Sequence, residues 1–188
     1  SMALTDHGNM FGIKEFADAA NKYNGKIKDK IKEQEKILND KEAEDSKKDD
    51  AAVEIDLLKT KIFKPIIGME AYCAPVSIDK RDGRADRGYH LIILAKNKQG
   101  YKNLCKLSSI AYIDGYYYNP RIDHSLLEKY HEGLIICSAC LGGELPQKIM
   151  NGDIEGAEQS LHWFKNLFGD DFYIEIQRHK TDKYNADR

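Results

Sequence analysis

The sequence lacks any apolar run long enough to cross a bilayer, and its start lacks the basic-then-apolar pattern of a signal peptide. It also lacks a charge excess, because 29 Lys and Arg against 31 Asp and Glu leave a formal net charge of -2. That balance excludes a general electrostatic footprint for nucleic acid. We therefore expect a soluble, cytoplasmic protein that meets DNA only through a local patch or through neighbouring domains.

Cysteine is scarce, with Cys73, Cys105, Cys137 and Cys140 as the four examples. A chain of 188 residues with 41% hydrophobic content can build its own core, so we expect reduced thiols. Cys137 and Cys140 have CxxC spacing, but no second pair accompanies them, which argues against a zinc ribbon. We expect Cys137 to lie in the core and Cys140, beyond a strand end, to be a candidate thiolate ligand.

A long charged segment interrupts the globular pattern. Residues 24–62 are mostly Lys, Glu, Asp and other polar types, with few large apolar side chains. We interpret them as a charged insertion, helical in part because Lys and Glu can pair along a helix, with a frayed tip at residues 46–50. A solvated arm is the simpler interpretation, and a partner-binding coiled coil is the alternative.

Elsewhere, strand and helix patterns alternate. Residues 3–5 end a buried strand whose beginning would precede Ser1, and residues 13–23 form an amphipathic helix. Further strands and helices are predicted for these ranges: strands 64–72, 90–95, 133–138 and 172–176, and helices 101–111 and 157–168, the last closed by Gly169. Because the strands are apolar on both faces, we expect a parallel α/β layout, with residues 79–88 as a surface loop.

Three polar residues lie at strand ends. His7 follows a strand in Thr-Asp-His-Gly-Asn (residues 5–9), where a turn or cap role is about as plausible as metal binding. Glu70 closes an apolar run, and a buried carboxylate needs a cation or a hydrogen-bond partner; an internal salt bridge to Lys or Arg is the ordinary solution. His90 opens its strand, so in a parallel sheet it should point to the opposite rim from the others.

Aromatic residues gather at 116–118, followed by Arg121. This loop suits stacking on a single-stranded base, although packing against a neighbouring surface is the simpler explanation. No chemistry is assigned to His124, His131 or His162, and His179 is a second-tier candidate.

Taken together, six segments resemble the successive signatures of one family. They are residues 3–12, 65–72, 90–97, 117–123, 138–144 and 173–177. In order and wording they are similar to the PHP (polymerase and histidinol phosphatase) domain at the N-terminus of the catalytic α subunit of bacterial DNA polymerase III. The resemblance covers the chain except residues 24–62.

The resemblance implies a distorted (β/α)7 barrel, incomplete in residues 1–188, and a cluster of divalent metals, zinc or manganese. Four positions of that cluster map onto His7, Glu70, His90 and Cys140, all metal-competent. It further implies metal-assisted phosphodiester hydrolysis by a 3′-5′ proofreading exonuclease, within a protein that polymerises DNA and joins other polymerase III subunits. No residues are assigned to catalysis or to nucleic-acid binding.

The chain departs from the family pattern at both ends. The family's first strand with its His-x-His pair would precede Ser1, and its Asp-x-His would follow Arg188. We therefore expect this fragment to be inactive alone, with partial or no metal occupancy and unpaired sheet edges. Two alternatives stay open: a structural, metal-stabilised domain that braces the polymerase, and a metallophosphoesterase resembling histidinol phosphatase.

Overall fold

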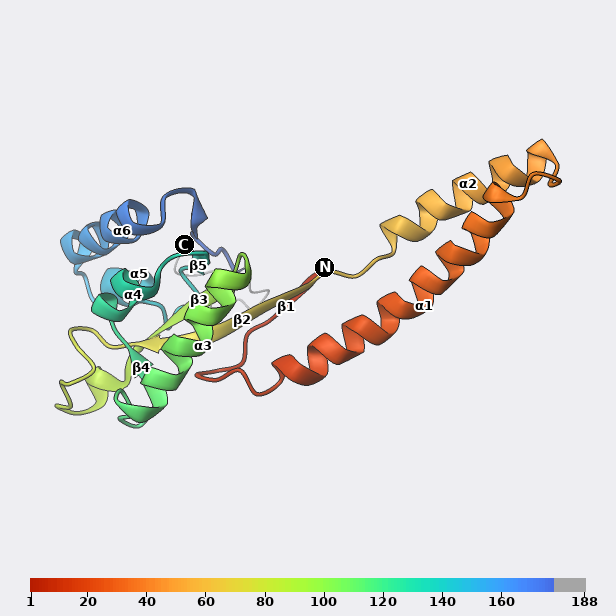
Figure 1. Cartoon of the computed structure of the whole chain (residues 1–188). Helices are drawn as coiled ribbons and strands as arrows, with labels where there is room; N and C mark the ends of the chain where they lie inside the picture. The colour runs from red at the N-terminus through yellow and green to blue at the C-terminus, as the bar shows by residue number, and fades with distance from the viewer. Residues whose placement is uncertain (178–188) are drawn as a thin grey trace, which may run out of the picture. The chain divides into compact units, whose positions relative to one another are not determined.

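The computed structural model describes residues 1–177, apart from the side chains of residues 84 and 85. His179 therefore lies outside the described residues. The chain divides into two compact units, the first comprising Ser1–Leu4 and Gly12–Ile66 and the second comprising Thr5–Phe11 and the chain from Ile67 onward. All four candidate ligands belong to the second unit. Figure 1 labels the elements.

The first unit is dominated by two antiparallel helices, α1 (Ile13–Asn39) and α2 (Asp45–Thr60) (Figure 1). Some of their apolar residues, among them Ile27, Ile55 and Leu58, are buried, whereas others, such as Val53 and Leu57, are exposed. The helical character predicted for residues 24–62 is confirmed. The frayed tip expected at residues 46–50 is wrong, because those residues begin α2 and the turn lies just before them.

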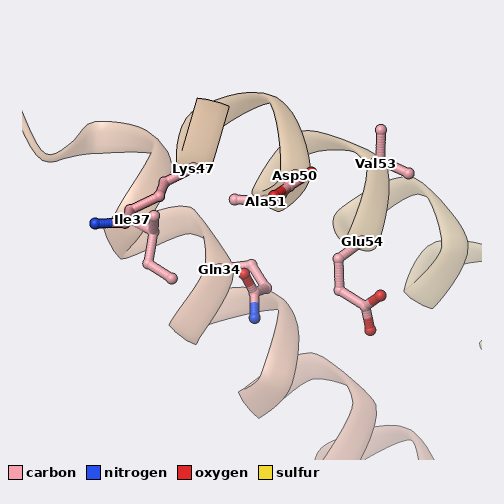
Figure 2. A pocket seen from close by; sticks show the side chains of 7 residues that line it. All are labelled: Gln34, Ile37, Lys47, Asp50, Ala51, Val53 and Glu54. Atoms are coloured by element: carbon pink, nitrogen blue, oxygen red, sulfur yellow. The ribbon is translucent and has the colours of Figure 1, made fainter. Parts of the chain in front are cut away.

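The end of this helical pair carries a shallow hollow of about 500 Å³ (Figure 2). Its walls combine both charges with exposed apolar groups: Gln34, Ile37, Lys47, Asp50, Ala51, Val53 and Glu54. Strand β1 (Met2–Leu4) also belongs to this unit, and the backbone N–H of Met2 donates to the carbonyl of Lys64. The strand predicted at residues 3–5 is present, but its predicted burial is wrong, since Ala3 is exposed and Leu4 and Thr5 are only partly buried.

A six-stranded mixed sheet runs in the order β1-β2-β3-β5-β6, with β4 on β2. Its further strands are β2 (Pro65–Cys73), β3 (Tyr89–Ala95), β4 (Arg121–Ile122), β5 (Leu134–Cys137) and β6 (Phe172–Tyr173). The predicted α/β class is confirmed, but the predicted parallel layout holds only for the pairs β2–β4 and β5–β6. Strand β3 runs antiparallel to both β2 and β5. For β2 and β3 the reason is the link between them, which holds only the 3-10 turn Arg84–Arg87 and no crossover helix.

Four helices accompany the sheet in the second unit: α3 (Lys98–Ile113), α4 (His124–Tyr130), α5 (Glu144–Met150) and α6 (Ile154–Phe168). Helices α3 and α6 were predicted, and Gly169 caps α6 at φ 56° as expected. The short helices α4 and α5 were missed, because seven residues give too little periodicity. Among residues 1–177, no helix combines the length and apolarity needed to cross a membrane.

The core of the second unit lies on one face of β2 and β3. Met69, Ala71, Leu91 and Ile93 are each at most 2% exposed. Residues between them in sequence point to the other face, because side chains alternate along a strand. Cys137 alternates with buried Ile136 in the same way and is only half-buried, so the expectation that it lies in the core is wrong.

Arg121, the predicted basic residue of the aromatic loop, is fully buried at 0% exposure. Its guanidinium donates hydrogen bonds to four backbone carbonyls, those of Ile78, Lys80, Asp86 and Gly115. The arginine therefore fixes the path of the loop before β3 and is not available to a ligand. The loop expected at residues 79–88 is thus anchored from inside, and Asp86 within it is 4% exposed.

Replacing Arg121 with Met should destabilise the chain by about 2–4 kcal/mol, because two buried and two partly buried carbonyls lose their donor. The matched control is Arg87→Met, whose guanidinium is exposed over the ring of Tyr118; it should change the free energy of unfolding by about 0.5 kcal/mol or less. Urea unfolding followed by circular dichroism measures both. Equal effects of the two substitutions would contradict the anchoring role.

Candidate metal centre

Three side chains of the second unit meet around the carboxylate of Glu70. Oε1 of Glu70 lies 2.7 Å from Nδ1 of His90, and Oε2 lies 3.4 Å from Nε2 of His7. One ligand atom from each residue falls within 4.8 Å of the others. The Glu70 side chain is 15% exposed, whereas that of His7 is 61% exposed, so the group lies at the surface with its carboxylate innermost.

The reversal of β3 explains why His90 belongs to this group. In the antiparallel register His90 lies opposite Tyr72 near the end of β2, and Glu70 lies opposite Ile92. The first residues of β3 therefore lie at the same end of the sheet as the last residues of β2. The expectation that His90 would point to the opposite rim is wrong for that reason. Glu70, Tyr72 and His90 all face away from the buried side of the sheet.

A tight loop brings His7 to the same place. The backbone N–H of Gly8 donates to the carbonyl of Glu70 at 2.8 Å, and the N–H of Glu70 donates to the carbonyl of Asp6 at 3.0 Å. Gly8 has φ 67°, and a Cβ there would lie 2.7 Å from Pro120. The Asn9 side chain closes the turn by donating to the His7 carbonyl and accepting from the N–H of Phe11. The glycine is required by both conformation and space.

Cys140 completes the predicted set. Its Sγ lies 3.6 Å from Nδ1 of His90 and accepts a hydrogen bond from the N–H of Gly142 at 3.3 Å. Ala139, directly before it, has φ 61°, a left-handed conformation that costs a non-glycine residue energy. The chain after β5 thus folds sharply back, and the N–H of His90 donates to the Gly142 carbonyl at 2.9 Å. The structure brings all four predicted residues together.

A cavity of about 530 Å³ opens beside His90. Its lining includes Tyr72 and Tyr89 as aromatic surfaces and Arg87, Gln147 and Asn151 as polar ones. Burial first and the charge of Glu70 second raise the pKa of Tyr72, so its hydroxyl stays protonated. A volume of this size suits a small ligand of mixed aromatic and polar character.

A second buried cluster was not found from the sequence. Glu144 is 6% exposed; its Oε1 accepts from Ser160 at 2.5 Å and from Lys148 at 2.8 Å, and its Oε2 lies 2.9 Å from Nε2 of His124. Burial opposes ionisation of Glu144, but these hydrogen bonds and the His124 charge together lower its pKa to about 2. The cluster links α4, α5 and α6 by satisfied polar contacts.

His124 had been given no role. Its ring stacks on Trp163 with centroids 3.8 Å apart and planes at 8°. The buried thiol of Cys73 also lies within 4.8 Å of the His124 and Glu144 ligand atoms. Burial raises the pKa of Cys73 well above its usual range, so this thiol is protonated. In the sequence only the i, i+4 spacing of Glu144 and Lys148 hinted at the cluster.

The ordinary explanation for Glu70, a salt bridge to Lys or Arg, is not what residues 1–177 display. Its carboxylate oxygens are directed at two imidazoles instead. The four cysteines are free thiols, as predicted. Two imidazoles, a carboxylate and a thiol, all of them groups that can ligate a metal ion, therefore lie together at one end of the central strands.

The family model of the PHP domain matches residues 1–179. The chain belongs to the PHP domain family. Its relatives are more specific: it is 43% identical over 180 residues to the DNA polymerase III subunit alpha of Borreliella burgdorferi. It is 39% identical over 184 residues to the protein of the same name from Deinococcus radiodurans, and 38% identical over 182 residues to that from Thermus aquaticus.

These alignments cover 95% of this chain in each case but only 11% or 12% of the relatives. The chain therefore spans about an eighth of the length of the curated relatives it matches. The resemblance recognised from six sequence segments is confirmed at the level of the family and of its polymerase branch.

The Glu144 cluster should make stability depend on pH in the acid range. The folded-state pKa of Glu144, about 2, lies below its ordinary value of 4.5, so the stabilisation is present above pH 4.5 and is lost as pH falls toward 2. Glu144→Gln should lower the free energy of unfolding by about 1–3 kcal/mol at neutral pH and flatten this acid dependence. Glu158→Gln, at an exposed position on α6, is the control.

Chemical unfolding at a series of pH values between neutral and acid provides the measurement. An unchanged acid slope in Glu144→Gln would contradict the assignment of this pH dependence to the cluster.

Proposed function

We propose that this chain is part of a DNA polymerase III alpha subunit, and that its PHP domain binds divalent metal through His7, Glu70, His90 and Cys140. The bound metal would serve phosphodiester hydrolysis at the 3′ end of DNA, as a proofreading exonuclease. The observation that carries the proposal is that the four side chains converge at one end of the central strands, with Glu70 Oε1 2.7 Å from His90 Nδ1. In its complete form the domain would be a distorted (β/α)7 barrel.

The donor set suits zinc or manganese. Imidazole nitrogen, carboxylate oxygen and thiolate sulfur are all zinc ligands, and in a tetrahedral site with bonds of about 2.0–2.3 Å the ligand atoms lie about 3.3–3.7 Å apart. His7 Nε2 and Glu70 Oε2 are 3.4 Å apart, and Cys140 Sγ and His90 Nδ1 are 3.6 Å apart. The shorter Glu70–His90 contact is a hydrogen bond, which a metal would replace.

A bound divalent ion would supply acidified water and would neutralise the charge of a phosphate. The chain's own residues do the rest. Glu70 orients both imidazoles through its two oxygens, and the backbone contacts of Gly8 and Gly142 fix the two loops beside β2 and β3. The cavity next to His90 is large enough for a terminal nucleotide. Tyr72 and Tyr89 offer faces for its base.

The family's further ligands are expected outside this chain. We propose that four ligands alone hold metal weakly and that the chain by itself does not hydrolyse DNA. Primer-template DNA and other polymerase III subunits are the proposed partners of the whole protein, in the cytoplasm. The charged segment 24–62 stays a predicted insertion.

Cobalt(II) titration tests the ligand set. The chain should develop the near-ultraviolet absorption of a thiolate–cobalt bond, and Cys140→Ser should abolish this band. Cys105→Ser, a half-buried thiol on α3, should keep it. Glu70→Gln should weaken cobalt affinity by more than about 100-fold, the upper range for loss of a mere supporting partner. A band that survives Cys140→Ser would refute the thiolate assignment.

A longer protein carrying this sequence tests the reaction. With zinc or manganese it should shorten a 5′-labelled single strand, and His90→Ala should slow this by at least about 100-fold while polymerisation is retained. If chelation of zinc lowers the melting temperature and the protein has no exonuclease activity before chelation, the metal domain is structural. Turnover of a small phosphomonoester in place of DNA would favour the phosphatase alternative.

A further inference from the structure

Three exposed aromatic rings form a row on the second unit. Phe11 and Tyr112 have centroids 6.3 Å apart with planes at 34°, and Tyr112 and Tyr116 have centroids 6.4 Å apart with planes at 33°. Phe11 is 80% exposed, Tyr112 40% and Tyr116 53%. The rings come from the loop after His7 and from the end of α3, two segments far apart in sequence.

The spacing of the rings leaves their faces available. Direct aromatic pairs have centroids about 4.5–7 Å apart, so these two contacts lie near the far end of that range. The rings are tilted against each other by 33–34°, so the row does not sandwich a base between two rings. Each ring instead offers its exposed surface, on which one unpaired base can stack.

A cation stands beside the row. Arg81 is exposed, and its Nη2 donates to the carbonyl of Asp114 at 3.0 Å, within the segment that joins Tyr112 to Tyr116. Single-stranded nucleic acid is commonly bound by aromatic faces for the bases and by nearby cations for the phosphates. Arg81 supplies the second element, which the buried Arg121 does not.

The row leads to the four-residue metal centre. Phe11 follows His7 by four residues on the same loop, and Tyr72 packs beside the two histidines of the centre. The Tyr72 ring is 6.4 Å from that of His7 and 5.2 Å from that of His90. The loop that carries His7 also carries Phe11, and the Asn9 side chain holds it by donating to the His7 carbonyl and accepting from the N–H of Phe11. The row of exposed rings therefore begins on the same loop as one of the candidate ligands.

We propose that Phe11, Tyr112 and Tyr116 bind unpaired bases of single-stranded DNA, with Arg81 on a phosphate, and so direct a strand end toward the centre at Glu70. This inference rests on the proposed function, because it names the form of DNA that the centre would receive. Paired bases in a duplex do not expose the faces that the rings need, so the row selects an unpaired end.

Fluorescence anisotropy with a labelled oligothymidine tests the row. The assay uses this chain with a metal chelator, so that no hydrolysis intervenes, and low salt. Phe11→Ala and Tyr116→Ala should each weaken binding by about 5- to 100-fold, the loss expected for one stacked base. Tyr23→Ala is the matched control, since Tyr23 is 49% exposed but lies on α1, and its affinity should equal that of the wild type.

An abasic strand of the same length separates stacking from charge. It should bind more weakly than oligothymidine and should not respond to Phe11→Ala. Arg81→Gln should reduce the salt dependence of oligothymidine binding by about 0.7 in the log–log slope, the value for one phosphate contact on a single strand. Phe11→Trp should retain binding. Addition of the strand should quench the fluorescence of this variant more than that of the wild type, whose single tryptophan is Trp163.

Equal affinity for abasic and thymidine strands, or normal binding by Phe11→Ala and Tyr116→Ala, would overturn the proposal. So would a chain that binds no strand at all, which would favour a protein partner for the rings. Because the assay contains no metal, its result is independent of the exonuclease. If DNA is hydrolysed but the three rings do not contribute to strand binding, only this inference is wrong. If the rings bind the strand but no hydrolysis occurs, only the proposed function is wrong. Melting temperatures confirm that each variant is folded.

Discussion

The contact between Glu70 and the two imidazoles is the interaction on which the candidate centre depends. A carboxylate that is 15% exposed needs partners, and it has two: His7, which precedes it in the sequence, and His90, which follows it. Each partner is held by its own backbone hydrogen bonds to a neighbouring segment, through Gly8 and Gly142. The backbone at this end of the sheet thus positions the candidate ligands, which do not depend on their mutual contacts alone.

Much of the fold could be predicted because the signals are local. The strands at Pro65–Cys73 and Tyr89–Ala95 follow from apolar runs, and α6 follows from its periodicity and its terminal glycine. Strand direction was not predictable in this way. Apolar runs on both faces suggest burial but do not distinguish a parallel neighbour from an antiparallel one, and the helix-free link before β3 decided the matter.

The four candidate ligands were found from the residues and the order of six segments that resemble the family, since each ligand residue alone fits a turn, a cap or a salt bridge. The networks around Glu144 and Arg121 were missed for a different reason. Their partners are backbone carbonyls and residues 16 or 20 positions away, and such pairings exist only once the chain is folded. A buried arginine also has the same sequence signature as an exposed one, so Arg121 was taken for a surface cation.

The alternation along β2 and β3 has one more consequence. Met69, Ala71 and Leu91 pack the interior, while Glu70 and His90 occupy the positions between them on the other face. Substitutions on the second set leave the packing of the first untouched. The candidate centre can therefore be altered one residue at a time while the interior of the domain keeps its packing. This separation makes the domain a scaffold on which other sets of ligands can be tried at the same position.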